Sequence, residues 1–282
     1  MNLSIFVLIP VFNRLHHTKR IIEALREQTK ADNLHIVIIN DGSTDGTAEY
    51  LQLQKDVIEL RGDGNLWWGG SIQMGLDYVY VQGNDEDYVL FLNNDTWFAP
   101  DYVETLIRIS REAGGAAVGS AIHEEGHDPP LVSIGPKINI NRLAVWDLLS
   151  QLSPEEQRDP KRTYRVDALS GRGTLYPAIL FRRYGGMHTR LLPHYMADYE
   201  IAMRFGRAGI PLLVSTEAVV FSPPVYGNDV SKIGLWQRYF SIRSSSNIVH
   251  GLMFYLLVGS FVQRITAPLR MLCFAILRSL PR

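Results

Sequence analysis

Apolar runs and amphipathic segments alternate along residues 1–112 of the chain. Short apolar runs rich in Val and Ile predict buried strands, and apolar side chains repeated every three or four positions predict helices. The predicted strands are residues 5–9, 35–39, 57–60 and 88–92. The predicted helices are residues 17–28, 47–53, 69–81 and 101–112. This alternation predicts an α/β fold with a mostly parallel central sheet and helices on both of its faces.

Polar, turn-forming residues follow three of these strands directly, at residues 10–13, 40–45 and 93–95. Ligands of open α/β sheets bind at the carboxyl ends of the strands. We therefore expect these three stretches, which are far apart in the sequence, to meet at one edge of the sheet.

The second half of the chain is patterned less regularly. Residues 123–165 are rich in Pro, Gly and charge and predict an excursion or flap, after which residues 198–209 predict a helix and residues 212–221 a strand. Near the end lie two apolar runs, residues 248–262 and 271–277, separated by Pro268. The first run is shorter than the roughly 20 apolar residues of a membrane span, and the proline discourages one continuous helix.

The composition is that of a globular protein with a large core. The chain has 282 residues, of which 46% are hydrophobic and 20% charged. Its single cysteine, Cys273, excludes a disulfide framework and a Cys-rich metal site, and it fits a reducing compartment. The apolar run near the N-terminus lacks the basic flank and the cleavage site of a signal peptide, so we interpret it as a strand.

The net charge of −1 conceals an uneven distribution. Residues 230–282 contain seven basic and no acidic residues, whereas residues 1–229 contain 21 basic and 29 acidic ones. We therefore divide the chain into a body, residues 1–225, and a basic, apolar helical tail, residues 226–282. The tail predicts contact with a membrane surface, and the alternative is packing on the body or on a second copy in a homodimer. The body has no basic stripe, which argues against a nucleic-acid partner.

Two carboxylates at strand ends are candidates for ligand binding. Asp41, in a turn of small residues, can accept hydrogen bonds from a nucleobase or a ribose, or it can form an Asx-turn that caps the next helix. Asp95 can hold Mg²⁺ or Mn²⁺ together with substrate phosphates, or it can belong to a plain turn.

Two helix starts are further candidates. Gly69 and Gly70 open a helix whose N–H groups can approach an anion, and the preceding Trp67 and Trp68 can stack on a sugar or pack in the core. Asp198 lies at the start of a helix, where the dipole helps to keep a general base ionised. The structural alternative for that segment is an N-cap at Asp198 and a Glu200–Arg204 pair at i,i+4.

Taken in order, these motifs resemble glycosyltransferase family 2, of the inverting GT-A fold and the bacterial cell-surface polysaccharide type. The resemblance covers roughly residues 3–221. It is carried by six motifs, which are Ile9-Pro10-Val11-Phe12-Asn13, Asn40-Asp41-Gly42-Ser43-Thr44-Asp45-Gly46-Thr47, Gly64-Asn65 with Gly69 to Gly75, Leu92-Asn93-Asn94-Asp95, Ser170-Gly171-Arg172-Gly173, and Ala197-Asp198-Tyr199-Glu200 with Arg204 and Gly209.

The resemblance implies a role for individual residues. Asp95 would hold the divalent metal, Mg²⁺ or Mn²⁺, and Asp198 would be the base that deprotonates the acceptor hydroxyl. Gly171 and Gly173 would line the acceptor side. The residues implied in nucleotide-sugar binding are Pro10, Val11, Phe12, Asn13, Asp41, Asn65, Trp68, Gly69, Gly70, Asn94 and Arg243.

The sequence departs from the family pattern at three places. Asn93 and Asn94 stand at the first two positions of the family's D-x-D element, which predicts weaker metal binding. Ala197 replaces the Glu of the Glu-Asp pair, so Glu200 becomes a second candidate base. No histidine follows the last core strand near residues 221–224.

The predicted function is inverting transfer of a sugar from a nucleoside-diphosphate sugar to a hydroxyl of a lipid-linked or polysaccharide acceptor. The predicted location is cytoplasmic, on the cytoplasmic face of the inner membrane. Two alternatives are a nucleotidyltransferase of similar fold, which would release pyrophosphate, and a degenerate module that binds sugar nucleotides or glycans without turnover.

Overall fold

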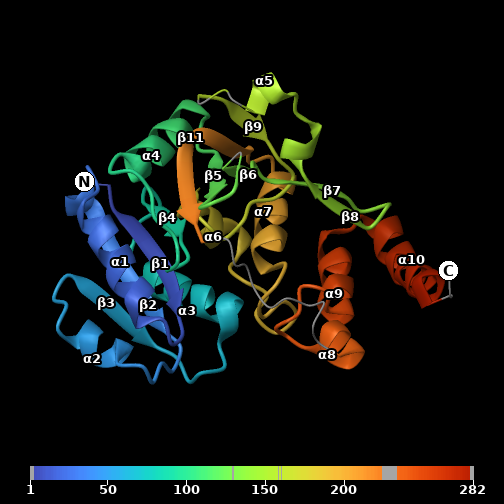
Figure 1. Cartoon of the computed structure of the whole chain (residues 1–282), viewed down its shortest axis with the longest axis horizontal. Coiled ribbons are helices and arrows are strands. Elements are labelled where there is room, and N and C mark those ends of the chain that lie inside the picture. Colours follow the sequence, from blue (N-terminus) through green and yellow to red (C-terminus); the bar gives the residue numbers. More distant parts are fainter. Residues whose placement is uncertain (1–2, 129, 158, 160, 224–233, 280–282) are drawn as a thin grey trace.

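A twisted sheet of nine strands forms the centre of the protein (Figure 1). The computed structural model describes residues 3–128, 130–157, 159, 161–223 and 234–279. Eight of the strands follow the order β3-β2-β1-β4-β10-β5-β11-β9, and β6 pairs with β5. Strands β3, β2, β1 and β4 are parallel, as are β5 and β11, while β10, β9 and β6 run antiparallel to their neighbours. The bounds are β1 Ile5–Val11, β2 Leu34–Asn40, β3 Val57–Arg61, β4 Tyr88–Phe91, β5 Ala117–Glu124, β6 Leu131–Ser133, β9 Thr163–Arg165, β10 Thr174–Pro177 and β11 Leu212–Ser222.

Helices cover both faces of this sheet, which confirms the predicted fold class. The alternation of side chains along β1 explains the two layers: Ile5, Val7 and Ile9 face a core shared with α1, α2 and α4, whereas Phe6 and Leu8 face one shared with α3, α6 and α7. The bounds are α1 Leu15–Arg26, α2 Thr47–Gln52, α3 Trp67–Gln82, α4 Tyr102–Glu112, α6 Ile179–Tyr184 and α7 Ala197–Arg207, with a 3₁₀ turn η1 at Ala31–Asn33.

The strand register brings the three polar stretches to one edge, as predicted. Val11 at the end of β1 lies opposite Asn40 at the end of β2. On the other side of β1, Leu8 lies opposite Phe91 at the end of β4. The loops after β1, β2 and β4 therefore leave the sheet at the same edge.

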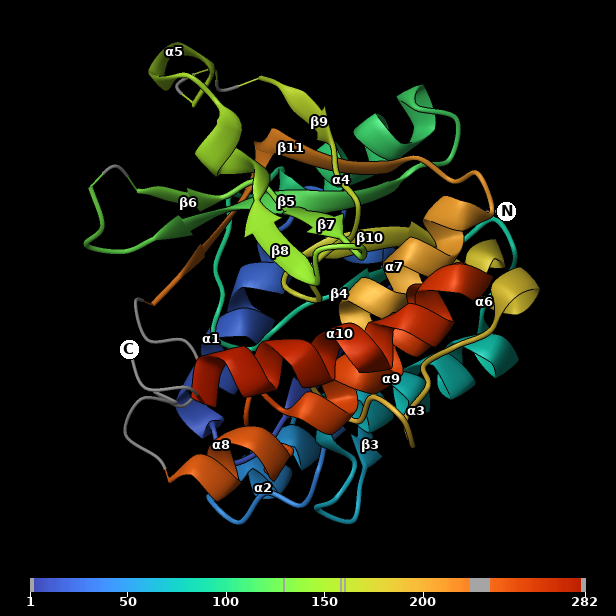
Figure 2. The same ribbon diagram turned by 90° about the vertical axis from the view of Figure 1, so that its right-hand side faces the viewer.

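The excursion predicted over residues 123–165 is built of short elements. Strands β6 and β9 add to the main sheet, while β7 and β8 form a separate antiparallel hairpin. Figure 2 shows these elements above the helical layer that contains α9 and α10. The remaining bounds are β7 Pro136–Asn139, β8 Ala144–Asp147, η2 Leu148–Gln151 and α5 Pro154–Gln157.

The tail forms three helices: α8 Leu235–Phe240, α9 Ile248–Val258 and α10 Phe261–Ser279. Helix α9 buries Phe254, Tyr255 and Val258 in the core that also contains Phe205 of α7, so this part of the tail is packed on the body. The predicted boundary between residues 225 and 226 lies outside the described residues. Among the described residues, no helix has both the length and the apolar character that crossing a membrane requires.

The break between the two tail helices differs from the one predicted at Pro268. Helix α10 contains Pro268, and the chain turns instead at Gly259 and Ser260. Ser260 and Gln263 form a capping box, in which the Ser260 N–H donates to Gln263 Oε1 at 2.9 Å and the Gln263 N–H to Ser260 Oγ at 3.4 Å. This start signal fixes the beginning of α10, and the proline is accommodated within it.

Candidate functional site

A cavity of about 740 Å³ lies at the sheet edge where β1, β2 and β4 end. Its walls come from the three strand-end loops, from the start of α3, from the segment before α7 and from the loop between α8 and α9. The lining residues are Pro10, Val11, Phe12, Arg14, Asp41, Gly64, Trp67, Trp68, Ser71, Asn93, Asn94, Asp95, Arg172, His194, Tyr195, Arg243 and Ser245.

The loops after β1 and β2 are locked together by Asn13. Its N–H donates to Ser43 Oγ at 3.0 Å, and its side-chain oxygen accepts from the Thr44 N–H at 2.7 Å. Asn13 adopts φ 50°, a left-handed conformation that Asn tolerates better than most residues. Asn13 thus fixes the two strand-end loops relative to each other, although it does not itself line the cavity.

Asp41 is buried and holds the neighbouring loop in place. Its carboxylate accepts hydrogen bonds from the N–H groups of Gly64 at 2.8 Å, Leu66 at 3.0 Å and Trp67 at 3.2 Å. The last two donors are at the start of α3, where a negative charge is favourable. Asp41 therefore joins the end of β2 to the start of α3 beside the cavity, and Asn65 lies in the loop that it holds.

Gly69 and Gly70 occupy the first turn of α3, but their N–H groups have other partners than the predicted anion. The Gly69 N–H donates to Pro193 O at 2.8 Å, and the Gly70 N–H donates to Leu66 O at 3.0 Å within the helix. A Cβ at Gly69 would lie 2.9 Å from Leu192 O. The structure thus gives Gly69 a role in close packing of α3 against the segment before α7.

The carboxylate predicted to hold a metal has a cationic neighbour. Asp95 Oδ2 accepts from Arg14 Nη1 at 2.5 Å. Beside it, Asn94 Nδ2 donates to Thr18 Oγ1 and Asn93 Oδ1 accepts from Trp68 Nε1, each at 3.3 Å. Among the described residues, no three His, Cys, Asp or Glu side chains gather as metal ligands.

One wall of the cavity is formed by aromatic and cationic side chains, namely Trp67, His194 and Arg243. The guanidinium of Arg243 lies 5.6 Å from the ring centre of Trp67, and the ring of His194 lies 5.8 Å from that of Trp67. Trp67 adopts φ 57°, which a bulky residue rarely does outside a constrained site. Burial, with the charges of His250 and Arg243, lowers the pKa of His194 to about 4, so its imidazole is neutral at pH 7.

Asp198, at the start of α7, is held by backbone N–H groups next to the cavity. Its Oδ2 accepts from the Gly171 N–H and its Oδ1 from the Tyr199 N–H, both at 2.9 Å. Burial raises the pKa of Asp198, while these N–H donors and the charge of Arg172 oppose the shift. The next residue after Gly171 is Arg172, which lines the cavity, so Asp198 borders the same site as Asp41 and Asp95.

Glycines 171 and 173 are required by the close packing around them. A Cβ at Gly171 would lie 2.6 Å from Cη2 of Trp68. Gly173 has φ +83°, and a Cβ there would lie 2.5 Å from the Tyr102 hydroxyl. Neither glycine lines the cavity, but Gly171 packs against Trp68, which does, whereas Gly173 packs against the buried side chains of Tyr102 and Val220.

The second candidate base, Glu200, is buried and engaged elsewhere. Its carboxylate receives two hydrogen bonds from Arg204, from Nε at 3.1 Å and Nη2 at 2.5 Å. This geometry favours the structural alternative, an i,i+4 pair within α7, over a role as base.

Most of the predicted nucleotide-binding residues meet in the cavity, and several residues that line it had no motif to identify them. Pro10, Val11, Phe12, Asp41, Trp68, Asn94 and Arg243 of that set line it, as does Asp95, the predicted metal ligand. The other candidate residues, Asn13, Asn65, Gly69, Gly70, Gly171, Gly173, Asp198 and Glu200, do not line it. Sequence reasoning missed the contributions of Arg14, Arg172, His194, Tyr195 and Ser245. Of these five residues, the sequence offered a signal for two: Arg14 follows a strand-end motif, and Arg172 lies within the motif Ser170–Gly173.

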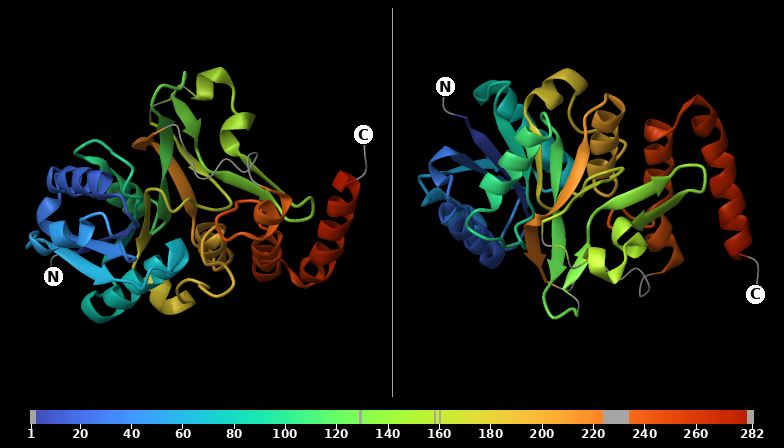
Figure 3. Two further views of the ribbon diagram at one scale, coloured as in Figure 1. Left: turned by 60° about the horizontal axis from the view of Figure 1, so that its bottom comes forward. Right: turned by 90° about the horizontal axis from the view of Figure 1, so that it is seen from above.

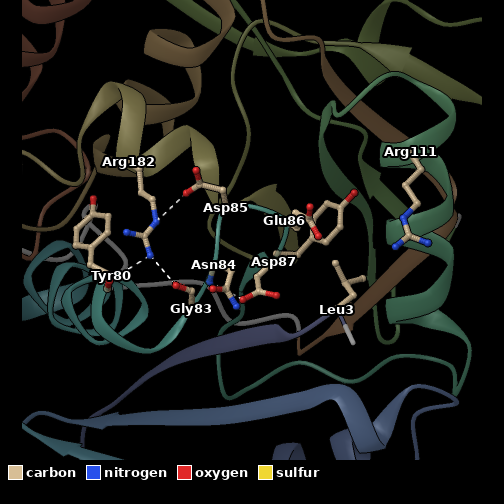
Figure 4. A pocket seen from close by; sticks show the side chains of 10 residues that line it. Leu3, Tyr80, Gly83, Asn84, Asp85, Glu86, Asp87, Arg111 and Arg182 are labelled. Carbon is tan, nitrogen blue, oxygen red and sulfur yellow. Dashed lines mark hydrogen bonds and ion pairs between the residues drawn. The ribbon is translucent and has the colours of Figure 1, made fainter. Parts of the chain in front are cut away.

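A second cavity, also of about 740 Å³, lies at the opposite edge of the sheet, where β4 begins (Figure 4). Its polar groups fix the loop that precedes β4. Asp87 accepts from the N–H groups of Ser4 at 2.9 Å and Asn84 at 2.7 Å, and Arg182 pairs with Asp85 and donates to Gly83 O. We therefore assign the candidate site to the cavity at the carboxyl ends of the strands.

Comparison with known proteins identifies the family of this fold and site. Residues 6–174, more than half of the chain, match the model of the family described as Glycosyl transferase family 2. Similar curated proteins include Glycosyltransferase GlyA of Streptococcus pneumoniae, 31% identical over 109 residues, and Putative glycosyltransferase EpsH of Bacillus subtilis, 28% identical over 112 residues. Each match covers 37% of this chain, but only 15% and 30% of the respective relative.

A solved structure agrees with this fold. The structure of GalNAc-T7 with UDP, GalNAc and Mn²⁺ superposes with a TM-score of 0.63 at 15% sequence identity. The match covers 78% of this chain and 44% of that one. The GT-A-like architecture thus extends beyond the residues that match the family model.

Proposed function

Because this chain belongs to glycosyltransferase family 2, we propose that it transfers a sugar from a nucleoside-diphosphate sugar to a hydroxyl of an acceptor. The observation that carries the proposal is the meeting of Asp41, Asp95 and the wall around Asp198 at one cavity. A volume of about 740 Å³ lies within the range of small-molecule sites.

The charges of the cavity suit a diphosphate. Among the described residues, those that line it include three arginines, Arg14, Arg172 and Arg243, and two carboxylates, Asp41 and Asp95. The negative charge of Asp41 is already stabilised by three backbone N–H groups. Arginine binds phosphate oxygens well because its planar guanidinium offers several donors, so we place the diphosphate between these side chains.

Asp95 fits a divalent ion of the kind that the comparison structure contains. Mg²⁺ and Mn²⁺ need one or two protein carboxylates when phosphate oxygens and water complete the shell. Asp95 lines the cavity and would hold the ion, and Asn94 lies beside it. When bound, the ion would neutralise charge on the leaving nucleoside diphosphate. The ion would compete with Arg14 for the carboxylate of Asp95, and Arg14 also lines the cavity in which the phosphates would lie.

Asp198 is the proposed base. Its carboxylate would take the proton of the acceptor hydroxyl as that oxygen attacks the anomeric carbon and the bond to the diphosphate breaks, with inversion of configuration. Both of its oxygens are oriented by backbone N–H groups, which fix the carboxylate toward the Gly171 wall. General-base catalysis of this kind contributes about 10²–10⁴-fold to the rate. The acceptor, for which we propose a glycan or a lipid-linked saccharide, would approach along the wall of Gly171 and Trp68.

A thermal-shift screen of nucleoside-diphosphate sugars, with and without Mn²⁺, tests donor binding. One sugar nucleotide should raise the melting temperature, because a ligand that binds only the folded state stabilises it. Chromatography of the products with that donor then tests transfer. Release of the nucleoside diphosphate supports the proposal, release of pyrophosphate would indicate a nucleotidyltransferase, and binding without turnover across donors and acceptors would indicate a binding module.

A further inference from the structure

Helices α8 and α10 of the tail expose large apolar side chains to solvent. On α8, Trp236 is 74% exposed and Phe240 is also exposed. On α10, Phe261 is 79% and Leu269 63% exposed, with Val262 and Ile265 between them also exposed. We call these six residues the outer apolar set.

The members on α10 lie on one side of the helix. Phe261, Ile265 and Leu269 are spaced by four residues, so they form a single stripe, and Val262 adjoins it. The other side of α10 is already covered, because Ala267 is buried and Arg270 Nη1 donates to Asn141 O at 2.6 Å. Helix α10 thus has apolar side chains both toward the protein and away from it. Figure 3 shows it at the edge of the molecule, far from the N-terminal strands.

We propose that the outer apolar set docks the protein on an anionic lipid surface. An amphipathic element of this kind lies in the membrane interface with its apolar side chains inserted and its cationic groups near the head groups. The set includes three aromatic residues, Trp236, Phe240 and Phe261, and aromatic side chains of these types are found on the apolar face of helices that lie in the membrane interface.

The charge of the tail favours lipid over a second copy of the chain. Residues 230–282 contain seven basic and no acidic residues. A two-fold contact would bring the same surface of each copy together, and like charges would then face each other, which opposes association. Anionic head groups attract the same charges.

Docking would also place the candidate site near the membrane. Arg243 and Ser245, which line the cavity, belong to the short loop between α8 and α9. A tail docked through α8 and α10 therefore holds part of the cavity wall close to the lipid surface. This step deepens the proposed function, on which it rests: it favours a saccharide carried by a lipid as the acceptor.

Vesicle sedimentation with the full chain tests the docking without any donor. The vesicles contain phosphatidylcholine alone or phosphatidylcholine with phosphatidylglycerol. The double variant Ile265→Asp/Leu269→Asp places two charges in the stripe. The matched control is Val81→Asp, which changes an apolar side chain of α3 that is 79% exposed and distant in sequence from the tail.

The native protein and the Val81→Asp control should bind the anionic vesicles, and added salt should weaken their binding. The double variant should bind at least ~10-fold more weakly, since it loses two inserted side chains and gains two charges. Circular dichroism shows whether the double variant folds. If it does not, a second pair of substitutions in the outer apolar set, Trp236→Ser and Phe261→Ser, should weaken vesicle binding in the same way.

Native protein that stays in solution with anionic vesicles would overturn the proposal, as would equal binding by the native protein and the variants. So would a native dimer, measured by analytical ultracentrifugation, that the double variant dissociates. Donor binding in the thermal-shift screen does not depend on these outcomes, so failure of the docking and failure of the proposed function are distinguishable.

Discussion

Replacing Gly171 by Ala should damage the candidate site from within its wall. The added Cβ would lie 2.6 Å from Cη2 and 2.9 Å from Cε2 of Trp68, whereas carbon atoms in contact are separated by about 3.5–4.0 Å. Cζ2 of the same ring would lie closer still, so either the indole or the backbone of residue 171 must move by at least about 1 Å. The indole lines the cavity, and the Gly171 N–H orients Asp198, so either movement disturbs the site.

This overlap allows the expected losses of stability and of turnover to be stated as magnitudes. Overpacking of this kind costs about 1–3 kcal/mol, which lowers the melting temperature of a chain of this size by about 2–10 °C. A displacement of about 1 Å at a catalytic group lowers turnover about 10²-fold. Differential scanning calorimetry measures the first effect, and release of nucleoside diphosphate measures the second.

Two further variants make this test specific. Gly234→Ala is the control, because a Cβ at Gly234 meets no atom of the described part of the chain within 4 Å and its backbone is extended. In a Trp68→Leu background, Gly171→Ala should cost less stability than in the native protein, since the clashing ring is gone. Native stability and turnover in Gly171→Ala would refute the packing of Trp68 against residue 171.

Three other predictions concern single carboxylates. Burial raises the pKa of Asp198, and a base must be ionised to act. As the pH is lowered, kcat/KM should therefore begin to fall at a pH above the usual pKa range of an aspartate. A fall that begins only within that range would contradict this prediction. Asp95→Ala should weaken donor binding in Mn²⁺ but not in EDTA, as calorimetric titration can show; equal loss in both would remove Asp95 from the metal site. Glu200→Gln should lower stability by about 1–3 kcal/mol in chemical denaturation, because it weakens the pairing of a buried carboxylate with Arg204, and should leave the KM for the donor unchanged.

The fold was predictable because its signals are local. Each strand of the first half is a short apolar run, and each is followed by an amphipathic helix, so order and type could be inferred without tertiary information. The break in the tail lies at Gly259 and Ser260 instead of the predicted Pro268, because the capping box of Ser260 and Gln263 starts a new helix there. A reciprocal pair of side-chain bonds at Ser260 fixed the helix start more strongly than the proline disfavoured its interior.

The candidate site was only partly predictable. Residues at strand ends, such as Asp41 and Asp95, could be placed because parallel strands share one carboxyl edge. His194, Tyr195 and Ser245 come from loops whose path depends on tertiary packing, and no spacing in the sequence indicates them. Local patterns also could not show that the N–H group of Gly69 is taken by Pro193 O.

The most direct test of the proposed site compares the native enzyme with Asp198→Asn in two assays on the same sugar nucleotide. The native enzyme should bind the donor and release nucleoside diphosphate in the presence of an acceptor. Asp198→Asn should bind the donor with similar affinity and lose turnover by about 10²–10⁴-fold. Near-native turnover in Asp198→Asn, or a native protein that binds no nucleoside-diphosphate sugar, would contradict a transfer site built around this cavity.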